Sequence, residues 1–315
     1  MRKPRINGIL GFPVAPFTSS NQLDKQALIE NINFLIEGGL DSIFVCAGAA
    51  EFQSLSRTEY ESIVEIAVSL CQGRIPVYTG VGGNIIDAME LARISEEKGA
   101  DGYLILPPYL INGEQEGLYN YYKAIIETTE INAIIYQRDN AVLTLETVRK
   151  LSALPQLIGI KDGVGNMERN IEFVQTLGQQ LNWINGMPLA EVTFPAYHPL
   201  GYTSYSSAIS NYIPHVSRLF YNAIQEEDHQ LINKLYKEVI FPINNIRKQK
   251  KGYAVSLIKA GMEIMGLSVG MKVRPPLVPV EKEHYLQLEK ILMNTLDHFP
   301  LKSTTHSIKA RGSHS

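Results

Sequence analysis

Residues 157–166 read LIGIKDGVGN, and this stretch holds the pattern from which the fold can be inferred. Its first residues form a short apolar run typical of a buried strand, and the run ends on Lys161, followed by Asp162 and a glycine-rich turn. A lysine at the end of a buried strand either extends to solvent or has a chemical function. The number and order of similar strands help to decide between these two interpretations.

Seven other short runs share this character, because each is rich in Ile, Val, Leu or Tyr and is bounded by Gly, Pro, Asn or Asp. The segments between them place apolar residues at three- and four-residue steps, as at Leu28, Ile32, Leu35 and Ile36, which predicts amphipathic helices. Ser56–Glu59, with the sequence SRTE, is a capping-box pattern that predicts the start of the second helix. The eight predicted strands are INGILGF, SIFVCA, PVYTG, GYLIL, NAIIY, LIGIK, NWING and YTSYS.

Strands that alternate with helices indicate parallel βαβ units, and eight such units close a (β/α)₈ or TIM barrel. A doubly wound open sheet is the alternative, but it usually has fewer strands. We therefore predict an α/β fold in which residues 1–222 form a TIM barrel and residues 223–303 form an appended C-terminal helical layer. That layer should contain helices near 228–249, 253–265 and 281–297. Residues 304–315 differ in character and are predicted to be an artificial tail.

Composition excludes several classes of protein. Hydrophobic residues make up 45% of the 315 residues and charged residues 19%, so a large core is expected and disorder is not. The net charge of −3 predicts no nucleic-acid partner, and no apolar run approaches the ~20 residues of a membrane span. The basic run at 247–251 is interpreted as a solvated helix end. The two cysteines, Cys46 and Cys71, are too few for a disulfide framework, which predicts a cytoplasmic location.

Two side chains that end adjacent predicted strands are the candidates for catalysis. Active-site residues of TIM barrels lie at the C-terminal ends of the strands, and neighbouring strands lie ~4.8 Å apart, so Lys161 and Tyr136 could converge. Burial would lower the pKa of the lysine from ~10.4 and free its amine to attack a ketone, while the tyrosine hydroxyl relays protons. Asp162 should point the opposite way. A solvated or salt-bridged Lys161 and an ordinary aromatic Tyr136 remain the alternatives.

Several motifs resemble a known superfamily. GIKDGVGN with Lys161, IIY ending at Tyr136, EQEGLY (114–119), IKAGMEIMG (258–266) and RPPL (274–277) resemble the dihydrodipicolinate synthase and N-acetylneuraminate lyase superfamily, over about residues 6–292. Within it, GFPVAPF, YQRDNAV, KDGVGNME, YSSAISNYIP and RKQKKGYAVSLIKAG are similar to the 5-dehydro-4-deoxyglucarate dehydratase branch.

The resemblance implies that Lys161 forms an imine with the ketone of a small keto-sugar acid, and that Tyr136 relays protons. Dehydration and decarboxylation would follow, without a metal or an organic cofactor. The resemblance also implies a homotetramer or homodimer. The orientation of Arg138 is open, because this side chain could instead pair with Asp139 or Asp162. The residues expected to bind the substrate are Gly48, Ala49, Ala50, Glu51, Arg138, Gly186, Ser206, Ser207 and Asn211.

Two departures from the family pattern bear on activity. Residues 47–51 read AGAAE where relatives usually carry Gly-Thr-Thr-Gly-Glu or a similar turn, so Ala49 lacks a hydroxyl and Ala50 replaces a glycine that could need positive φ. We expect weaker activity for that reason. Leu110 stands in place of a second relay tyrosine, which disfavours aspartate-semialdehyde condensation. The alternatives are a pyruvate-dependent aldolase or synthase, and a catalytically impaired barrel that only binds a keto-sugar acid.

Overall fold

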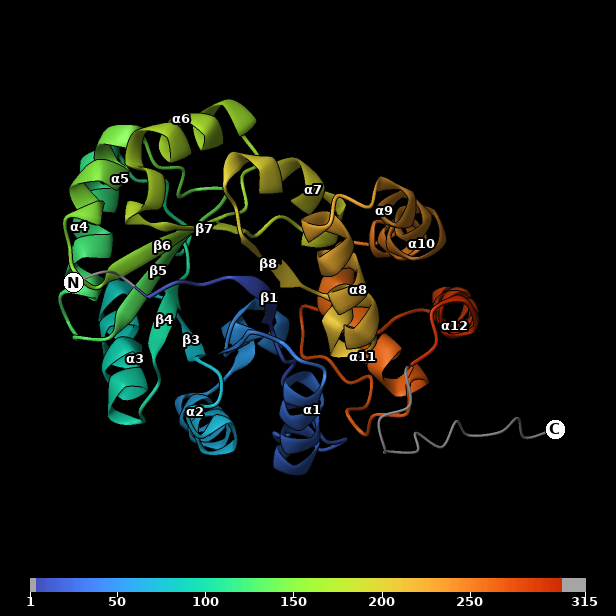
Figure 1. The fold of residues 1–315 in the computed structure, drawn as a ribbon. Coiled ribbons are helices and arrows are strands. Elements are labelled where there is room, and N and C mark those ends of the chain that lie inside the picture. Colours follow the sequence, from blue (N-terminus) through green and yellow to red (C-terminus); the bar gives the residue numbers. More distant parts are fainter. Residues whose placement is uncertain (1–3, 302–315) are drawn as a thin grey trace.

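The computed structural model describes residues 4–301, and its eight parallel strands close into a single barrel (Figure 1). Each strand pairs with the next along the chain, and the first pairs with the last. The predicted TIM barrel is therefore confirmed, and every predicted strand matches an observed one to within two residues at each end. The strands are β1 (Gly8–Gly11), β2 (Ser42–Val45), β3 (Val77–Val81), β4 (Gly102–Ile105), β5 (Asn132–Gln137), β6 (Leu157–Asp162), β7 (Asn182–Asn185) and β8 (Ser204–Ser207).

A helix follows each strand and packs on the outside of the barrel (Figure 1). The predicted apolar positions Leu28, Ile32 and Leu35 are buried, and the capping box at Ser56 and Glu59 is present with both of its hydrogen bonds. These helices are α1 (Lys25–Glu37), α2 (Arg57–Cys71), α3 (Ile85–Glu97), α4 (Gln115–Ile126), α5 (Leu145–Ser152), α6 (Met167–Leu177), the short α7 (Phe194–Tyr197) and α8 (Pro214–Gln225).

Two apolar clusters hold the barrel together. The smaller cluster contains Leu10, Phe44, Ile134, Ile158 and Ile184 and fills the inside of the barrel. The larger cluster lies between the strands and the surrounding helices and continues under the C-terminal helices. Because the inside is filled with side chains, a ligand can enter only at the ends of the barrel.

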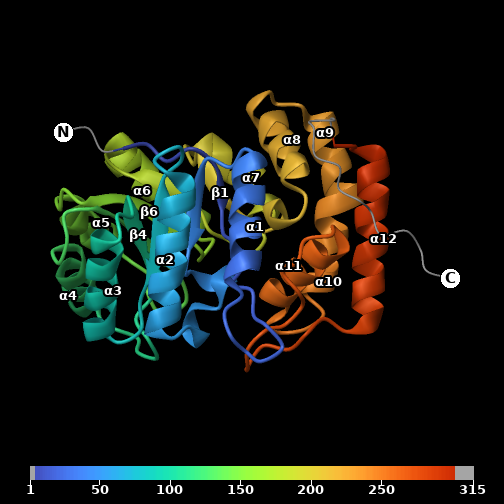
Figure 2. The same cartoon turned by 90° about the horizontal axis from the view of Figure 1, so that it is seen from below.

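The C-terminal helices form a layer against one side of the barrel, next to α8 and α1 (Figures 1 and 2). They agree with the three predicted helical segments, except that a π-helical turn at Tyr236–Ile240 divides the first segment in two. Residues 302–315, with the predicted artificial tail, lie outside the described residues. In residues 4–301, no helix has both the length and the apolar character needed to cross a bilayer. The helices of the layer are α9 (His229–Leu235), α10 (Phe241–Arg247), α11 (Tyr253–Ile264) and α12 (Lys282–His298).

Candidate active site

A cavity of about 290 Å³ lies at the C-terminal mouth of the barrel, between the strand ends and helices α10 and α11. Three cationic side chains line it, those of Arg138, Lys161 and Arg247, and no Asp or Glu is among the described residues of its wall. Elsewhere in residues 4–301, no cluster of three or more His, Cys, Asp and Glu side chains is placed to hold a metal ion. The cavity is therefore suited to an anionic organic ligand.

A bulge in β6 turns Lys161 into this cavity. Ala133 of β5 pairs with Leu157, but the next residue, Ile134, pairs with Gly159, so Ile158 is an extra residue in β6. Such a bulge shifts the alternation of side chains by one position. Tyr136 and Lys161 then pair directly across the two strands, and both line the cavity.

Lys161 is 5% exposed, and its environment favours a neutral amine. Its Nζ atom lies 3.7 Å from the centroid of the Tyr136 ring and 5.3 Å from that of the Phe12 ring. No salt bridge to Lys161 is present in the described part of the chain. Burial lowers the pKa of Lys161 against the opposing influence of Tyr136, and the nearby Arg138 lowers it further. A deprotonated lysine amine is a nucleophile for ketones.

The Tyr136 hydroxyl is held between a donor and an acceptor. It donates to the Gly186 carbonyl oxygen at 3.1 Å and accepts from Arg138 Nη1 at 3.3 Å. Burial opposes ionisation of the phenol, but the charges of Lys161 and Arg138 hold the pKa of Tyr136 below its ordinary value. A phenol with a lowered pKa and fixed hydrogen bonds can donate and accept protons near neutral pH.

Asp162 faces the opposite side of β6, as side-chain alternation predicts. Its carboxylate accepts hydrogen bonds from the Tyr197 hydroxyl at 2.6 Å, from Asn170 Nδ2 at 2.8 Å and from Gln137 Nε2 at 3.1 Å. It also accepts the backbone N–H of Val164. Asp162 thus secures the turn that follows Lys161 and forms no salt bridge to it within the described residues.

The turn after β2 is placed differently from what the sequence suggested. It is a 3₁₀ turn, η1 (Gly48–Ala50), and only Gly48 and Ala49 of the four expected residues line the cavity. The N–H groups of Ala50 and Glu51 donate to the carbonyl oxygens of Ala47 and Gly48, so they are not free for a substrate. Within the described chain, the N–H groups of Gly48 and Ala49 have no such partner. These two are the candidate donors to a carboxylate.

Glu51 is an anchor instead of a substrate ligand, because its side chain points away from the cavity. The carboxylate is fully buried and accepts hydrogen bonds from Lys259 Nζ and from the backbone N–H of Arg274, each at 2.7 Å. Lys259 lies on α11, so this contact joins the turn after β2 to the C-terminal layer. The residue has a left-handed backbone with φ of 56°, which the two contacts hold in place.

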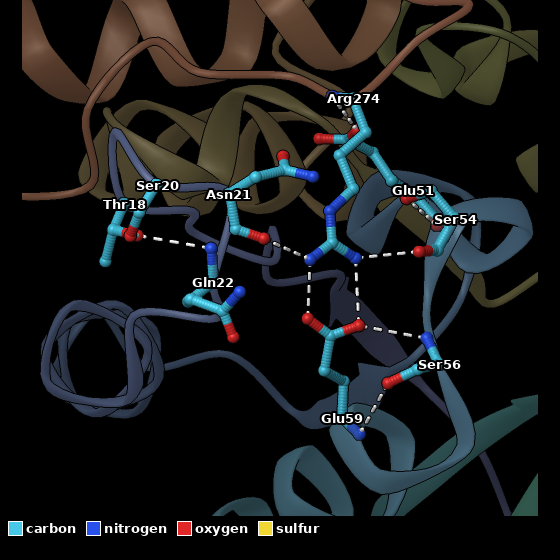
Figure 3. Close-up of polar contacts among 9 residues, drawn as sticks. All are labelled: Thr18, Ser20, Asn21, Gln22, Glu51, Ser54, Ser56, Glu59 and Arg274. Carbon is cyan, nitrogen blue, oxygen red and sulfur yellow. Dashed lines mark hydrogen bonds and ion pairs between the residues drawn. The ribbon is translucent and has the colours of Figure 1, made fainter.

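The Arg274 side chain extends this anchor to the start of α2 (Figure 3). Its guanidinium forms a salt bridge with Glu59, with Nη1 at 2.9 Å from Oε2, and donates to the carbonyl oxygens of Ser54 and Asn21. The Arg274 guanidinium lowers the pKa of Glu59 to about 2. The same Glu59 completes the capping box with Ser56, so helix α2 and the turn are fixed by one network.

Lys259→Met should destabilise the protein by about 3–5 kcal/mol, because it leaves the buried Glu51 carboxylate without its counter-charge. The free energy of unfolding in urea measures this loss. The double variant Lys259→Met/Glu51→Gln should recover much of it. Lys150→Met, which removes an exposed pair with Glu146, is the control and should change stability little. Equal stability of Lys259→Met and the wild type would show that the buried pair is unimportant.

Ala50 does not need a glycine-like backbone. The residues of this segment with positive φ are Cys46 and Glu51, at 53° and 56°, and Ala50 is not among the positive-φ residues of the described chain. The strain considered for Ala50 therefore does not arise. Ala49, in contrast, presents its methyl group to the cavity, where relatives of the superfamily pattern would present a hydroxyl.

Ala49→Ser should therefore raise kcat/KM by roughly 5- to 150-fold, the range that corresponds to about 1–3 kcal/mol for a positioned hydroxyl. Ala50→Gly should give no such gain, because the present backbone already suits alanine. Steady-state kinetics of the two single variants separate these effects. No gain for Ala49→Ser would contradict the expectation that the missing hydroxyl limits activity.

The polar residues after β8 are not equally available to a ligand. Ser206 lines the cavity, and its hydroxyl has no hydrogen-bond partner in the described structure. The hydroxyl of Ser207 is already engaged, since it donates to Glu191 Oε1 at 2.6 Å and lies 2.9 Å from Ser217 Oγ. Asn211 donates through Nδ2 to the Phe12 carbonyl oxygen, but its buried Oδ1 has no partner. Ser206 and Asn211 are thus the better candidates, and Ser207 supports the strand end.

Gly186 provides space for Lys161. A Cβ atom at this position would lie 2.7 Å from Lys161 Nζ and 2.6 Å from its Cγ. Its carbonyl oxygen also accepts the Tyr136 hydroxyl, so the glycine contacts both candidate catalytic groups.

Gly186→Ala should lower kcat/KM by roughly 10²-fold, because it displaces the reactive amine by a fraction of a bond length or more. The stability loss should stay at about 1–3 kcal/mol or less, since the atoms displaced belong to a flexible side chain. Gly117→Ala is the matched control, because a Cβ there meets no other atom within 4 Å. Full activity of Gly186→Ala would contradict the proposed position of the amine.

Arg138 and Arg247 face the cavity from opposite parts of the chain. Arg138 lies just after β5 and also pairs with Asp139, at 3.2 Å between Nε and Oδ2. Arg247, at the end of α10, was interpreted from the sequence as part of a solvated helix end, and that interpretation is wrong because Arg247 is half-buried and lines the cavity. Ile243, four residues earlier, lines the same wall, and this helical spacing is the signal that could have identified Arg247.

Solved structures with this barrel define the class of protein. The crystal structure of dihydrodipicolinate synthase from Oceanobacillus iheyensis matches with a TM-score of 0.86 and 28% identity, over 92% of this chain and 96% of that one. The synthase from Aquifex aeolicus matches with a TM-score of 0.84 and 26% identity, over 95% and 100%. The sequence profile of the Dihydrodipicolinate synthetase family matches residues 5–295. The chain belongs to this family.

More similar relatives carry a more specific name. A protein of Bacillus subtilis (strain 168) is 62% identical over 298 residues, which cover 95% of this chain and 97% of that protein. A protein of Bacillus licheniformis is 64% identical over 293 residues, with 93% and 95% covered. Both are named "Probable 5-dehydro-4-deoxyglucarate dehydratase". They confirm the resemblance to the dehydratase branch that the sequence motifs indicated.

Proposed function

We propose that this chain is a decarboxylating hydro-lyase that converts 5-dehydro-4-deoxyglucarate into 2,5-dioxopentanoate, water and carbon dioxide. The observation that carries the proposal is the buried Lys161 amine, 3.7 Å from the centre of the Tyr136 ring, in a cavity without a described acidic residue in its wall. The name shared by the relatives supplies the substrate.

The reaction begins with attack of the neutral Lys161 amine on the ketone carbon. Tyr136 gives a proton to the oxygen and later helps to remove it as water, which leaves a protonated imine. The imine accepts electrons from the neighbouring carbon when that carbon loses a proton. The resulting enamine expels the hydroxyl group one carbon further along as a second water molecule.

Decarboxylation uses the same electron sink. After the elimination, a carbon–carbon double bond is conjugated with the imine, and the bond to the distal carboxylate lies next to it. When that bond breaks, carbon dioxide leaves and its electron pair flows through the double bond to the imine nitrogen. Protonation of two carbons and hydrolysis, which consumes the water formed with the imine, release the product and free Lys161. One substrate thus gives one product, one water and one carbon dioxide.

The free polar groups of the cavity suit the two ends of this substrate. The unpartnered N–H groups of Gly48 and Ala49 can bind the carboxylate beside the ketone. Ser206 and the unpartnered Oδ1 of Asn211 can bind hydroxyl groups. Arg138 adds positive charge next to Tyr136. The aldolase or synthase alternative needs a second relay group, and Leu110 is instead 82% exposed on its loop.

An assay of carbon dioxide and 2,5-dioxopentanoate formed from purified 5-dehydro-4-deoxyglucarate tests the proposal. The wild type should release both in equal amounts, and Lys161→Ala should release neither. Consumption of pyruvate with an aldehyde, without carbon dioxide release, would instead indicate an aldolase or synthase. Binding of the substrate without any product or borohydride-trapped adduct would indicate the binding-only barrel.

We also propose that the protein acts in the cytoplasm as a homodimer or homotetramer. The free and buried Cys46 and Cys71 are compatible with a reducing compartment. Tyr109, Leu110 and Ile111 form an exposed apolar stretch, 67–82% exposed, which is typical of a surface covered by another subunit. Sedimentation equilibrium measures the subunit number, and a monomer at micromolar concentration would contradict this part of the proposal.

A further inference from the structure

We infer that Arg247 of α10 acts with Arg138 as the binding site for the second carboxylate of the substrate, so that the C-terminal layer selects dicarboxylic over monocarboxylic 2-oxo acids. This inference rests on the proposed function, because it concerns the ligand of the same cavity. It adds a specificity-determining residue that lies outside the barrel, more than eighty positions after Lys161 in the chain.

The first observation is that the Arg247 guanidinium is unpaired. The residue is half-buried and lines the cavity, yet no hydrogen bond or salt bridge to its side chain is present among residues 4–301. Arg274, by comparison, is bonded to a carboxylate and two carbonyl oxygens. Leaving the donors of a charged group unpaired away from water is unfavourable, so an unpaired and half-buried guanidinium is best explained by a missing anionic ligand.

The second observation is that two cations share this side of the cavity. Burial lowers the pKa of Arg247, and the charge of Arg138 lowers it further. Two guanidinium groups repel one another unless an anion lies between them, and guanidinium geometry matches a carboxylate through paired N–H···O bonds. No acidic side chain of the described cavity wall can supply that anion.

The third argument is that the two ends of the cavity differ in charge. The turn after β2 offers the neutral N–H groups of Gly48 and Ala49, while Arg138 and Arg247 offer full positive charges. The proposed reaction removes the distal carboxylate as carbon dioxide. The product therefore loses the group that the arginine pair binds, which weakens its affinity and favours its release.

The test uses two keto acids of equal chain length that differ only in the distal carboxylate, 2-oxoadipate and 2-oxohexanoate. Each is incubated with the full-length protein and reduced with borohydride, and the concentration that gives half-maximal adduct at Lys161 is measured by mass spectrometry. The wild type should need less 2-oxoadipate than 2-oxohexanoate. Arg247→Met should reduce that preference about 10- to 100-fold, through 2-oxoadipate alone.

Lys248→Met is the matched control, because Lys248 is the exposed neighbour on the same helix end and its loss changes the net charge equally. It should keep the wild-type preference. Arg247→Lys, which retains the charge but not the planar fork, should give an intermediate preference and covers the case in which Arg247→Met does not fold.

Three results would overturn the inference. One is an unchanged preference in both Arg247 variants. Another is an equal loss of trapping for the two acids, which would show that Arg247 positions the site instead of selecting the ligand. The third is a wild type that traps both acids equally well. A wild type that traps neither acid would overturn the proposed function together with the inference, so the two failures are distinguishable.

Discussion

Replacing Lys161 with alanine is expected to lower kcat/KM by roughly 10⁴-fold or more, because no other group in the cavity can form the imine. Lys161 is the lysine of the described cavity wall, and its pKa is lowered chiefly by burial, so its amine is available near neutral pH. Carbon dioxide release from 5-dehydro-4-deoxyglucarate is the measurement. Activity within tenfold of the wild type would remove the basis of the proposed mechanism.

Stability provides the control for this variant. Burial of an unpaired amine costs free energy, so Lys161→Ala should unfold at a urea concentration close to that of the wild type. The variant Lys161→Met keeps more of the side-chain volume and should be equally inactive. If either variant unfolds far more easily, its loss of activity reports on folding, and the other variant decides.

Tyr136→Phe is expected to lower kcat by roughly 10²- to 10⁴-fold, the range for loss of a general acid–base group. The ring that packs 3.7 Å from Lys161 Nζ is retained, so the cavity should keep its shape. Imine formation with pyruvate should become slow but should still reach completion. Unchanged kcat would show that the hydroxyl takes no part in proton transfer.

The pH profile distinguishes a proton relay from a packing role. Tyr136 raises the pKa of Lys161, opposing the larger effect of burial. Removing the hydroxyl removes this influence, so the pKa of the amine should fall. The acid limb of kcat/KM, where the amine becomes protonated, should then move to lower pH. A loss of activity with no movement of this limb would indicate that the phenol does not interact with the amine electrostatically.

The sequence predicted the barrel and the pair Lys161 and Tyr136 because local patterns carry that information. Each strand is a short apolar run between turn residues, and the helices have their own period. Two polar side chains at the ends of consecutive strands must lie close together once the sheet is parallel. The bulge at Ile158, which sets the direction of Lys161, has no distinct sequence signal, and the prediction succeeded because it relied on the strand end.

The less accurate expectations concern side chains whose partners are distant in sequence. Glu51 was expected at the substrate, but Lys259 and Arg274, more than 200 positions later, bind it outside the cavity. Ser207 is engaged by Glu191 in the same way. No pattern within one strand and its loop contains these contacts, so an inward or outward orientation could not be assigned.

Arg247 was missed for a related reason. A run of basic residues at the end of a helix is usually solvated, and only the packing of α10 over the barrel mouth turns one of them inward. Helical spacing from Ile243 indicates which residue it is, but this indication has meaning only when the buried face of α10 is known. Tertiary packing therefore supplied the part of the site that local sequence could not.

The most direct test of the whole account is to locate the covalent adduct. The wild-type protein is incubated with 5-dehydro-4-deoxyglucarate or with pyruvate, reduced with borohydride, digested and analysed by mass spectrometry. The account predicts one modified lysine, Lys161, and no modification in Lys161→Ala. An adduct on a different lysine, or no adduct with either keto acid, would contradict it.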